Sequence, residues 1–215
     1  MGENTAGIAF AEGLVFAGNF GTGPDFAGTV AVIDPATSAV TEVIDVPAGP
    51  TGMVVGPDGA VYGATFRDPG IYRIDPATLA VTTAELGMGP LDVGAVGGEI
   101  WVADIDTGTV HRVEPGSLEI IGEFPLADPQ FVSGGGGYGW VSGASLWAVE
   151  AGTGDTTDFE VVGPTSVQVT ADAAYVAGFD GRIHRIAPPS PDGEATVIAE
   201  IPGAALWAAA VGNGY

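Results

Sequence analysis

Short apolar runs separated by Gly- and Pro-rich turns recur along the chain, about every 40 residues. The clearest copies are GPTGMVVGPDGAVYGATFRDPGIYRIDPATLAV (49–81) and GPLDVGAVGGEIWVADIDTGTVHRVEPGSLEI (89–120). Each copy predicts an apolar strand, a tight turn, a second strand, a loop and a third strand that ends in an acidic-Pro turn. A unit of this length with several short strands is typical of a β-propeller.

The predicted first strands open at six positions and divide residues 1–215 into repeats of one all-β domain. The repeats are 5–50, 51–90, 91–129, 130–164 and 165–203, with a partial unit at 204–215. We therefore expect a β-propeller with five complete four-stranded blades and the first strand of a sixth repeat. A five-bladed ring with one additional strand is favoured. A six-bladed ring and a fragment of a longer propeller are the alternatives.

Apolar residues occupy both faces of several predicted strands, for example AVYGATF (60–66) and EIWVADI (99–105). A strand with one solvent-facing side alternates apolar and polar residues, so these runs predict blades that are covered on both faces by their neighbours. No segment shows the sustained 3.6-residue period of an amphipathic helix.

The charge excludes several classes of partner. The chain has 27 acidic residues against 5 basic ones, all Arg, which gives a net charge of −22. Such a surface repels phosphate backbones and anionic lipid headgroups, so we expect no nucleic-acid binding. The acidity has two interpretations: a soluble surface, or a halophilic protein whose self-repulsion is relieved when salt screens it.

Other compositional features change the picture less. The absence of Cys excludes disulfides and thiolate metal sites. No apolar run reaches about 18 residues, so we expect no membrane insertion. The first ten residues lack the basic and apolar regions of a signal peptide.

Three segments, GPTGMVVGPDGAVY (49–62), IYRIDPAT (71–78) and WVADIDTGTVHRVEP (101–115), carry a recognisable repeat. They resemble the propeller repeats of the superfamily that holds streptogramin-lyase-like, NHL and YVTN proteins. The resemblance covers nearly the whole chain and implies the propeller fold and an extracytoplasmic location, secreted or at the cell surface. Members include lyases, metal-dependent lactonases and non-catalytic binding proteins, so the resemblance implies no single function.

Residues that return at one repeat position are predicted to be structural. Arg73, Arg112 and Arg185 share such a position and are expected to pair with acidic residues. Asp34 and Asp75 open the following turn, where a carboxylate can accept hydrogen bonds from backbone amides.

The two histidines, His111 and His184, also share a repeat position, which Ala31, Tyr72 and Trp147 fill in other units. A position that accepts such different side chains is interpreted as a packing site between blades. The histidines nevertheless stay the weak candidates for general acid–base catalysis, because imidazole titrates near neutral pH.

In a propeller blade, the entrance to the first strand and the loop between the second and third strands lie on the same face. These places supply the candidate ligand-binding residues Thr51, Arg67, Asp92, Gln130 and Ser166. The carboxylates of Asp92, Asp104 and Asp106 are weak candidates for a calcium or magnesium site at the axis, since hard cations prefer oxygen ligands. The alternative interpretation is a hydrated, acidic pore mouth.

Three functions follow from these features. The first is a non-catalytic module that binds a small molecule or a protein. The second is a lyase or lactonase-like enzyme assisted by a divalent cation. The third is a structural subunit of a larger assembly, which would form an oligomer to complete its ring. The sequence favours the first and leaves the enzyme question open.

Overall fold

The computed structural model describes residues 5–87, 89–170, 172–187 and 194–202. These residues form five antiparallel four-stranded sheets, here called blades 1 to 5, each in sequential strand order. Blade 1 comprises β1 (Thr5–Ala11), β2 (Leu14–Asn19), β3 (Gly28–Asp34) and β4 (Ala39–Val46). Blade 2 comprises β5 (Pro50–Val55), β6 (Val61–Thr65), β7 (Gly70–Ile74) and β8 (Val81–Glu85). Blade 3 comprises β9 (Pro90–Val96), β10 (Glu99–Asp104), β11 (Thr109–Val113) and β12 (Ile120–Pro125). Blade 4 comprises β13 (Phe131–Gly135), β14 (Tyr138–Ser142), β15 (Leu146–Glu150) and β16 (Thr156–Phe159). Blade 5 comprises β17 (Pro164–Val169), β18 (Ala174–Gly178), β19 (Arg182–Ile186) and β20 (Ala195–Glu200).

The prediction of five four-stranded β-propeller blades is confirmed. Every blade begins within one residue of its predicted repeat start. The partial unit at 204–215 lies outside the described residues. Within the described ranges there is no helix, and therefore none that could span a membrane.

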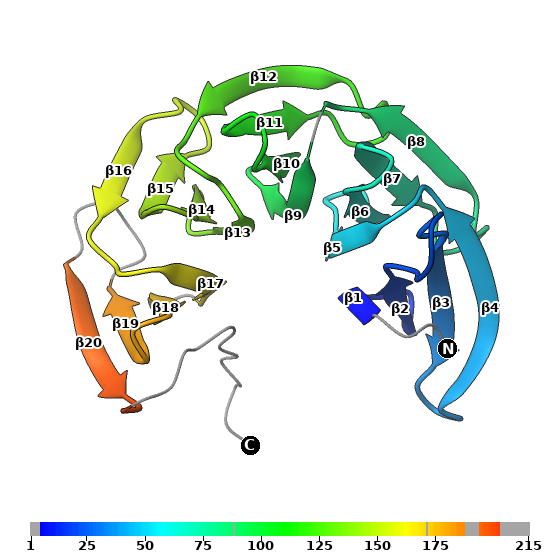
Figure 1. Ribbon diagram of the computed structural model, residues 1–215, viewed down its shortest axis with the longest axis horizontal. Helices are drawn as coiled ribbons and strands as arrows, with labels where there is room; N and C mark the ends of the chain where they lie inside the picture. The colour runs from blue at the N-terminus through cyan, green and yellow to red at the C-terminus, as the bar shows by residue number, and fades with distance from the viewer. Residues whose placement is uncertain (1–4, 88, 171, 188–193, 203–215) are drawn as a thin grey trace.

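The blades stand side by side in an arc, with their first strands near the axis and their fourth strands at the outer edge (Figure 1). The first strands contact one another in order, from β1 through β5, β9 and β13 to β17. Figure 1 also shows an opening between blade 1 and blade 5.

Four apolar cores hold the arc together, one between each pair of successive blades. In each core, a fully buried aromatic side chain from the second strand of one blade packs against aliphatic residues of the next blade. Tyr62, for example, lies with Ile100 and Val102. The aromatic residues at the four interfaces are Phe16, Tyr62, Trp101 and Trp140. The expectation that blades are covered on both faces is thus met for blades 2, 3 and 4.

The inner strands approach one another very closely near the axis. A β-carbon on Gly52 would overlap with Oδ1 of Asp92 and would lie 2.9 Å from its Cα atom. A β-carbon on Gly134 would likewise overlap with the carbonyl oxygen of Ala95. Glycine is therefore needed at these positions because neighbouring strands fill the space that a side chain would take.

We predict that Gly52→Ala lowers the free energy of unfolding by about 2 kcal/mol, because the inner strands must separate to admit the methyl group. The melting temperature should fall by roughly 4–8 °C for a chain of this size. Gly152→Ala is the matched control, since a β-carbon there meets nothing within 4 Å. Thermal melts of both variants check this, and an unchanged melting temperature for Gly52→Ala would show that the strands are not in contact.

Candidate functional site

The inner strands β5, β9, β13 and β17 border an axial cavity of about 410 Å³. Apolar residues and glycines make up most of its wall. The polar side chains among its described lining residues are those of Asp92, Ser133 and Gln168. Ser133 Oγ and Gln168 Nε2 both donate hydrogen bonds to the carbonyl oxygen of Val167, at 2.7 Å and 3.3 Å. Asp92 is therefore the ionisable group of the described cavity wall.

Asp92 connects three inner strands. Its carboxylate Oδ2 accepts a hydrogen bond from the backbone nitrogen of Val132 on β13, at 2.9 Å, while Oδ1 lies against Gly52 on β5. Burial raises the pKa of Asp92 to about 7, and hydrogen bonds from the backbone of Val132 and Val93 oppose this rise only in part. A carboxyl group that titrates near neutral pH inside a cavity is a candidate for binding or proton transfer.

Asp92 and Asp104 point to opposite sides of blade 3. Asp92 pairs with Ala103 across the sheet, and Ala103 belongs to the core between blades 3 and 4. The Asp104 carboxylate lies on the other side, where Oδ2 is 3.3 Å from the position of a β-carbon on Gly87. Asp106 is exposed in the loop that follows. The described residues contain no group of three or more His, Asp or Glu side chains that could hold a metal ion.

Asp104 caps its own loop. Its buried Oδ1 accepts a hydrogen bond from the backbone nitrogen of Thr107, at 3.0 Å. The residues at the same strand end in blades 1 and 2 behave similarly, since Asn19 accepts from the Gly21 nitrogen and Thr65 donates to the Asp68 carbonyl. This recurrence explains the polar residue at this place as part of the loop structure.

The histidines lie between blades. His111 is 6% exposed, with Nε2 3.7 Å from Asp104 Oδ2 and Nδ1 3.5 Å from Glu123 Oε2. His184 is 7% exposed, and burial, assisted by the charge of Arg182, lowers its pKa against the opposing effect of Asp180. The structure thus brings His111, but not His184, to two carboxylates.

The other ligand-binding residues predicted on first strands lie outside the axial cavity, and two of them hydrogen-bond within the protein. Thr51 Oγ1 donates to the carbonyl oxygen of Ala64 at 3.3 Å, and Gln130 Nε2 donates to the carboxylate of Asp128 at 3.1 Å. Ser166 is half-buried on β17. None of these three lines the axial cavity, although Asp92 does.

Arg67 is exposed and lies over three phenylalanine rings. Its guanidinium carbon is 4.4 Å from the ring centre of Phe26, 5.7 Å from that of Phe66 and 5.9 Å from that of Phe20. These are cation–π distances. Within the described part of the chain no carboxylate lies within ion-pair distance of Arg67, and the neighbouring Asp68 accepts from the Ala48 nitrogen instead.

Two of the three repeated arginines pair with acidic residues, as the sequence predicts. Arg73 donates to Asp58 at 2.8 Å, and Arg112 Nε donates to Glu99 at 2.7 Å. Asp34 and Asp75 accept from backbone amides of their turns, also as predicted. These side chains stabilise the scaffold.

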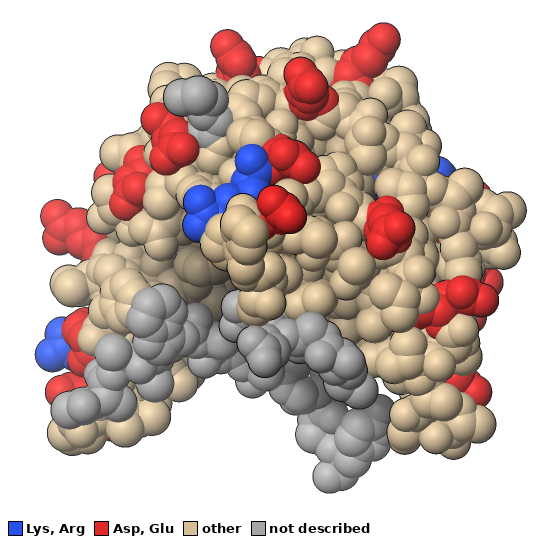
Figure 2. Space-filling model, turned by 45° about the vertical axis from the view of Figure 1, so that its right-hand side comes forward, with Lys and Arg blue, Asp and Glu red and all other residues tan. Residues whose placement is uncertain are grey.

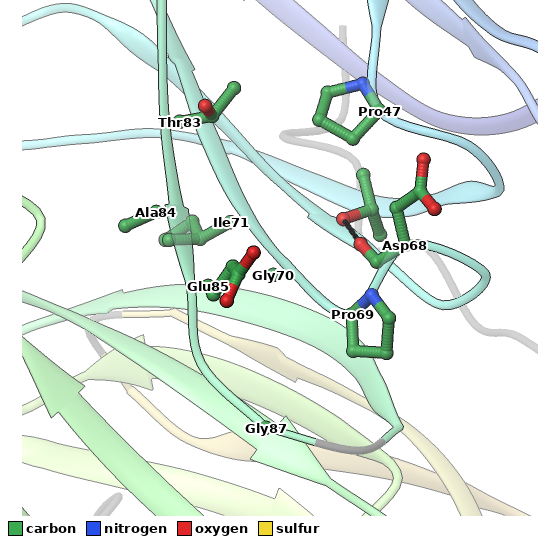
Figure 3. A pocket seen from close by; sticks show the side chains of 10 residues that line it. Pro47, Asp68, Pro69, Gly70, Ile71, Thr83, Ala84, Glu85 and Gly87 are labelled. Carbon is green, nitrogen blue, oxygen red and sulfur yellow. Dashed lines mark hydrogen bonds between the residues drawn. The ribbon is translucent and has the colours of Figure 1, made fainter.

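A cleft of about 790 Å³ lies on blade 2. Figure 3 shows Thr83, Ala84 and Glu85 of β8 on one side and Pro47, Asp68 and Pro69 on the other. Sequence reasoning missed Pro47 and Glu85, because it considered only strand entrances and the loops between second and third strands. The position of Glu85 at the end of a fourth strand was the available signal.

Carboxylates are spread over the face of the molecule shown in Figure 2, with few arginines among them.

Comparisons with known proteins agree on the fold. A family model described as "Domain of unknown function (DUF5074)" matches residues 1–98. No curated protein sequence matches the chain at a significant level. Among solved structures, a catalytically inactive variant of virginiamycin B lyase from Staphylococcus aureus with quinupristin is similar with a TM-score of 0.76 and 20% identity, over 93% of this chain and 70% of the lyase.

Two further structures are similar. BamB from Moraxella catarrhalis has a TM-score of 0.64 and 14% identity, over 89% of this chain and 60% of BamB. A protein of unknown function from Bacteroides caccae has a TM-score of 0.66 and 13% identity, over 92% and 81% of the two chains. At these identities the comparisons show the fold alone. They confirm the resemblance to streptogramin-lyase-like propeller repeats at that level.

We predict that Asp92→Asn stabilises the protein at pH 8 and leaves it nearly unchanged at pH 4. The pKa of Asp92 is raised in the folded state from 3.8 to about 7. Native stability is therefore highest below pH 4 with respect to this group, and it falls as pH rises toward 7 because the buried carboxyl must ionise. The difference at pH 8 is at most on the order of 4 kcal/mol.

Melting temperatures of the native chain and of Asp92→Asn between pH 4 and 8.5 measure this effect. The exposed Asp45→Asn is the control and should show no such divergence with pH. Parallel pH profiles for native chain and Asp92→Asn would mean that Asp92 is solvated and ionises freely.

Proposed function

We propose that the chain is a non-catalytic binding module that holds a cationic group of its ligand, an amine or guanidinium, in the cleft on blade 2. The observation that supports this most directly is the pair of carboxylates, Asp68 and Glu85, on opposite sides of this cleft. No arginine is found among the described residues that line it. A cation that enters the cleft therefore meets opposite charge on both sides.

The walls of the cleft suit a side chain with an apolar stem. Pro47 and Pro69 form one side, and Ile71 and Ala84 lie opposite. A lysine or arginine side chain combines an apolar stem with a charged end, so both parts would be accommodated. The net charge of −22 would also draw a basic segment toward the protein over a distance set by the ionic strength.

The catalytic alternative has one observation in its favour. Asp92 borders the axial cavity and has a pKa near 7, which suits proton transfer. The other polar side chains of the described wall, Ser133 and Gln168, are hydroxyl and amide groups that hydrogen-bond to Val167. Neither can act as a partner acid or base at neutral pH, and the binding proposal therefore fits the described residues better.

Titration calorimetry at about 0.1 M salt with a pentalysine peptide, acetylated only at its N-terminus so that all five side chains stay cationic, tests the binding proposal. The double variant Asp68→Asn/Glu85→Gln should weaken binding about tenfold, because each exposed ion pair contributes up to about 1 kcal/mol. Both substitutions keep the shape of the cleft, and the side-chain carbonyl that Asp68→Asn introduces can still accept from the Ala48 nitrogen.

The control double variant, Asp155→Asn/Glu119→Gln, removes the same charge from exposed residues of blades 4 and 3 that do not line the cleft. It should change the dissociation constant less than about twofold, because screening weakens distant surface charges. Equal weakening by both double variants would show that the peptide responds only to the overall charge of the protein. The proposal that the cleft on blade 2 holds the cationic group would then be wrong.

A further inference from the structure

The outer face of blade 1, on the side away from blade 2, consists of two rows of apolar side chains. The strand register places Ile8, Ala17, Ala31 and Val43 opposite one another in the first row. The second row contains Phe10, Val15, Ile33 and Val40. Opposed residues in an antiparallel sheet point to the same side, so all eight lie on one face.

This face is open to solvent. Ile8 is 68% exposed, Phe10 63% and Val43 60%. A hollow of about 280 Å³ lies on it, with Ala17 and Ala31 among its lining residues. A contiguous apolar surface of this kind marks an interaction site.

The equivalent face is buried in every other blade. The position of Ala31 corresponds to Tyr72, His111, Trp147 and His184, which are 0%, 6%, 7% and 7% exposed. In each case the preceding blade covers the face and contributes its second-strand aromatic residue to the interface. Blade 1 thus carries the same packing surface, and none of the other four described blades covers it.

We propose that the outer face of blade 1 is the docking surface for a further blade of the same repeat, joined to this chain in one polypeptide. The opening in the arc of Figure 1 lies on this side of blade 1. Where blade 3 covers blade 4, Trp101 lies against Gly139, whose counterpart on blade 1 is Val15. The aromatic residue in the second strand of the further blade would therefore pack against Val15 and Ile33, next to the hollow at Ala31. This inference does not depend on the ligand cleft of blade 2.

The repeat itself favours a tethered blade over a second copy of the chain. The equivalent faces of blades 2 to 5 are each covered by the preceding blade of the same chain. A covalent connection holds two such faces together at a high effective concentration.

The fold comparison points the same way. The match covers 93% of this chain and 70% of the virginiamycin B lyase chain, so the remainder of that longer chain is unmatched. Its fold therefore contains more chain than the five blades described here.

A chain extended by its own repeats tests the proposal. A copy of residues 130–203, which contain blades 4 and 5, is joined ahead of Thr5. The copy of blade 5, with Tyr175 in its second strand, then precedes blade 1. Ile8→Asp should lower the melting temperature of the extended protein by roughly 4 °C or more, because the aspartate is then buried. In the unextended chain the same substitution should change it by less than about 1 °C.

Ile121→Asp on β12, where Ile121 is 47% exposed, is the matched control and should have little effect in either protein. If the extended protein melts cooperatively and Ile8→Asp has the same small effect as in the unextended chain, the added blade does not cover the face and the proposal is wrong.

A second measurement uses the unextended chain alone and holds even if the extension misfolds. Sedimentation velocity should give a monomer at all concentrations, and Ile8→Asp with Phe10→Ser should reduce the fluorescence of the uncharged dye Nile red. A concentration-dependent dimer that Ile8→Asp abolishes would assign the face to a second copy and overturn the proposal. Unchanged dye fluorescence would overturn it as well, since the face would not be accessible.

Discussion

The packing of one blade face on the next is the interaction on which the rest of the structure depends. Each sheet has only four short strands, and an isolated sheet of that size leaves both apolar faces in water. Stacking buries one large aromatic side chain per interface, Phe16, Tyr62, Trp101 or Trp140, against the aliphatic rows of the following blade. The cores are therefore between blades, and each blade depends on its neighbours for stability.

The same packing decides which residues are left for function. Side chains that face a neighbouring blade, such as Tyr72 and His184, are buried and serve the interface. The inner strands approach one another closely at Gly52 and Gly134, and the Asp92 carboxylate at the axial cavity already accepts a hydrogen bond from the backbone. The binding groups that we propose, Asp68 and Glu85, lie instead in a loop and at a strand end, at the cleft on blade 2.

Much of this fold was predictable from the sequence because the repeat period, the turn residues and the two-sided apolar strands all reflect local structure. The ion pairs that Arg73 and Arg112 form with acidic residues, and the turn caps of Asp34 and Asp75, were predictable for the same reason.

The candidate site was less predictable from the sequence than the fold. Asp92 and Asp104 were expected to converge, but the sheet places them on opposite faces of blade 3. Arg67 stacks on Phe26 of another blade, which no local pattern reveals. The outer face of blade 1 has the same pattern as the other blades, so only the structure shows that it is uncovered.

Native-state hydrogen exchange, resolved by strand, tests the dependence of each blade on its neighbours most directly. Blade 3 has both faces covered, whereas blade 1 has one. The account predicts that amides of β2 and β3 exchange through a local opening of lower free energy than amides of β10 and β11. Equal protection of the two blades would contradict it, because blade stability would then not arise from the covered faces.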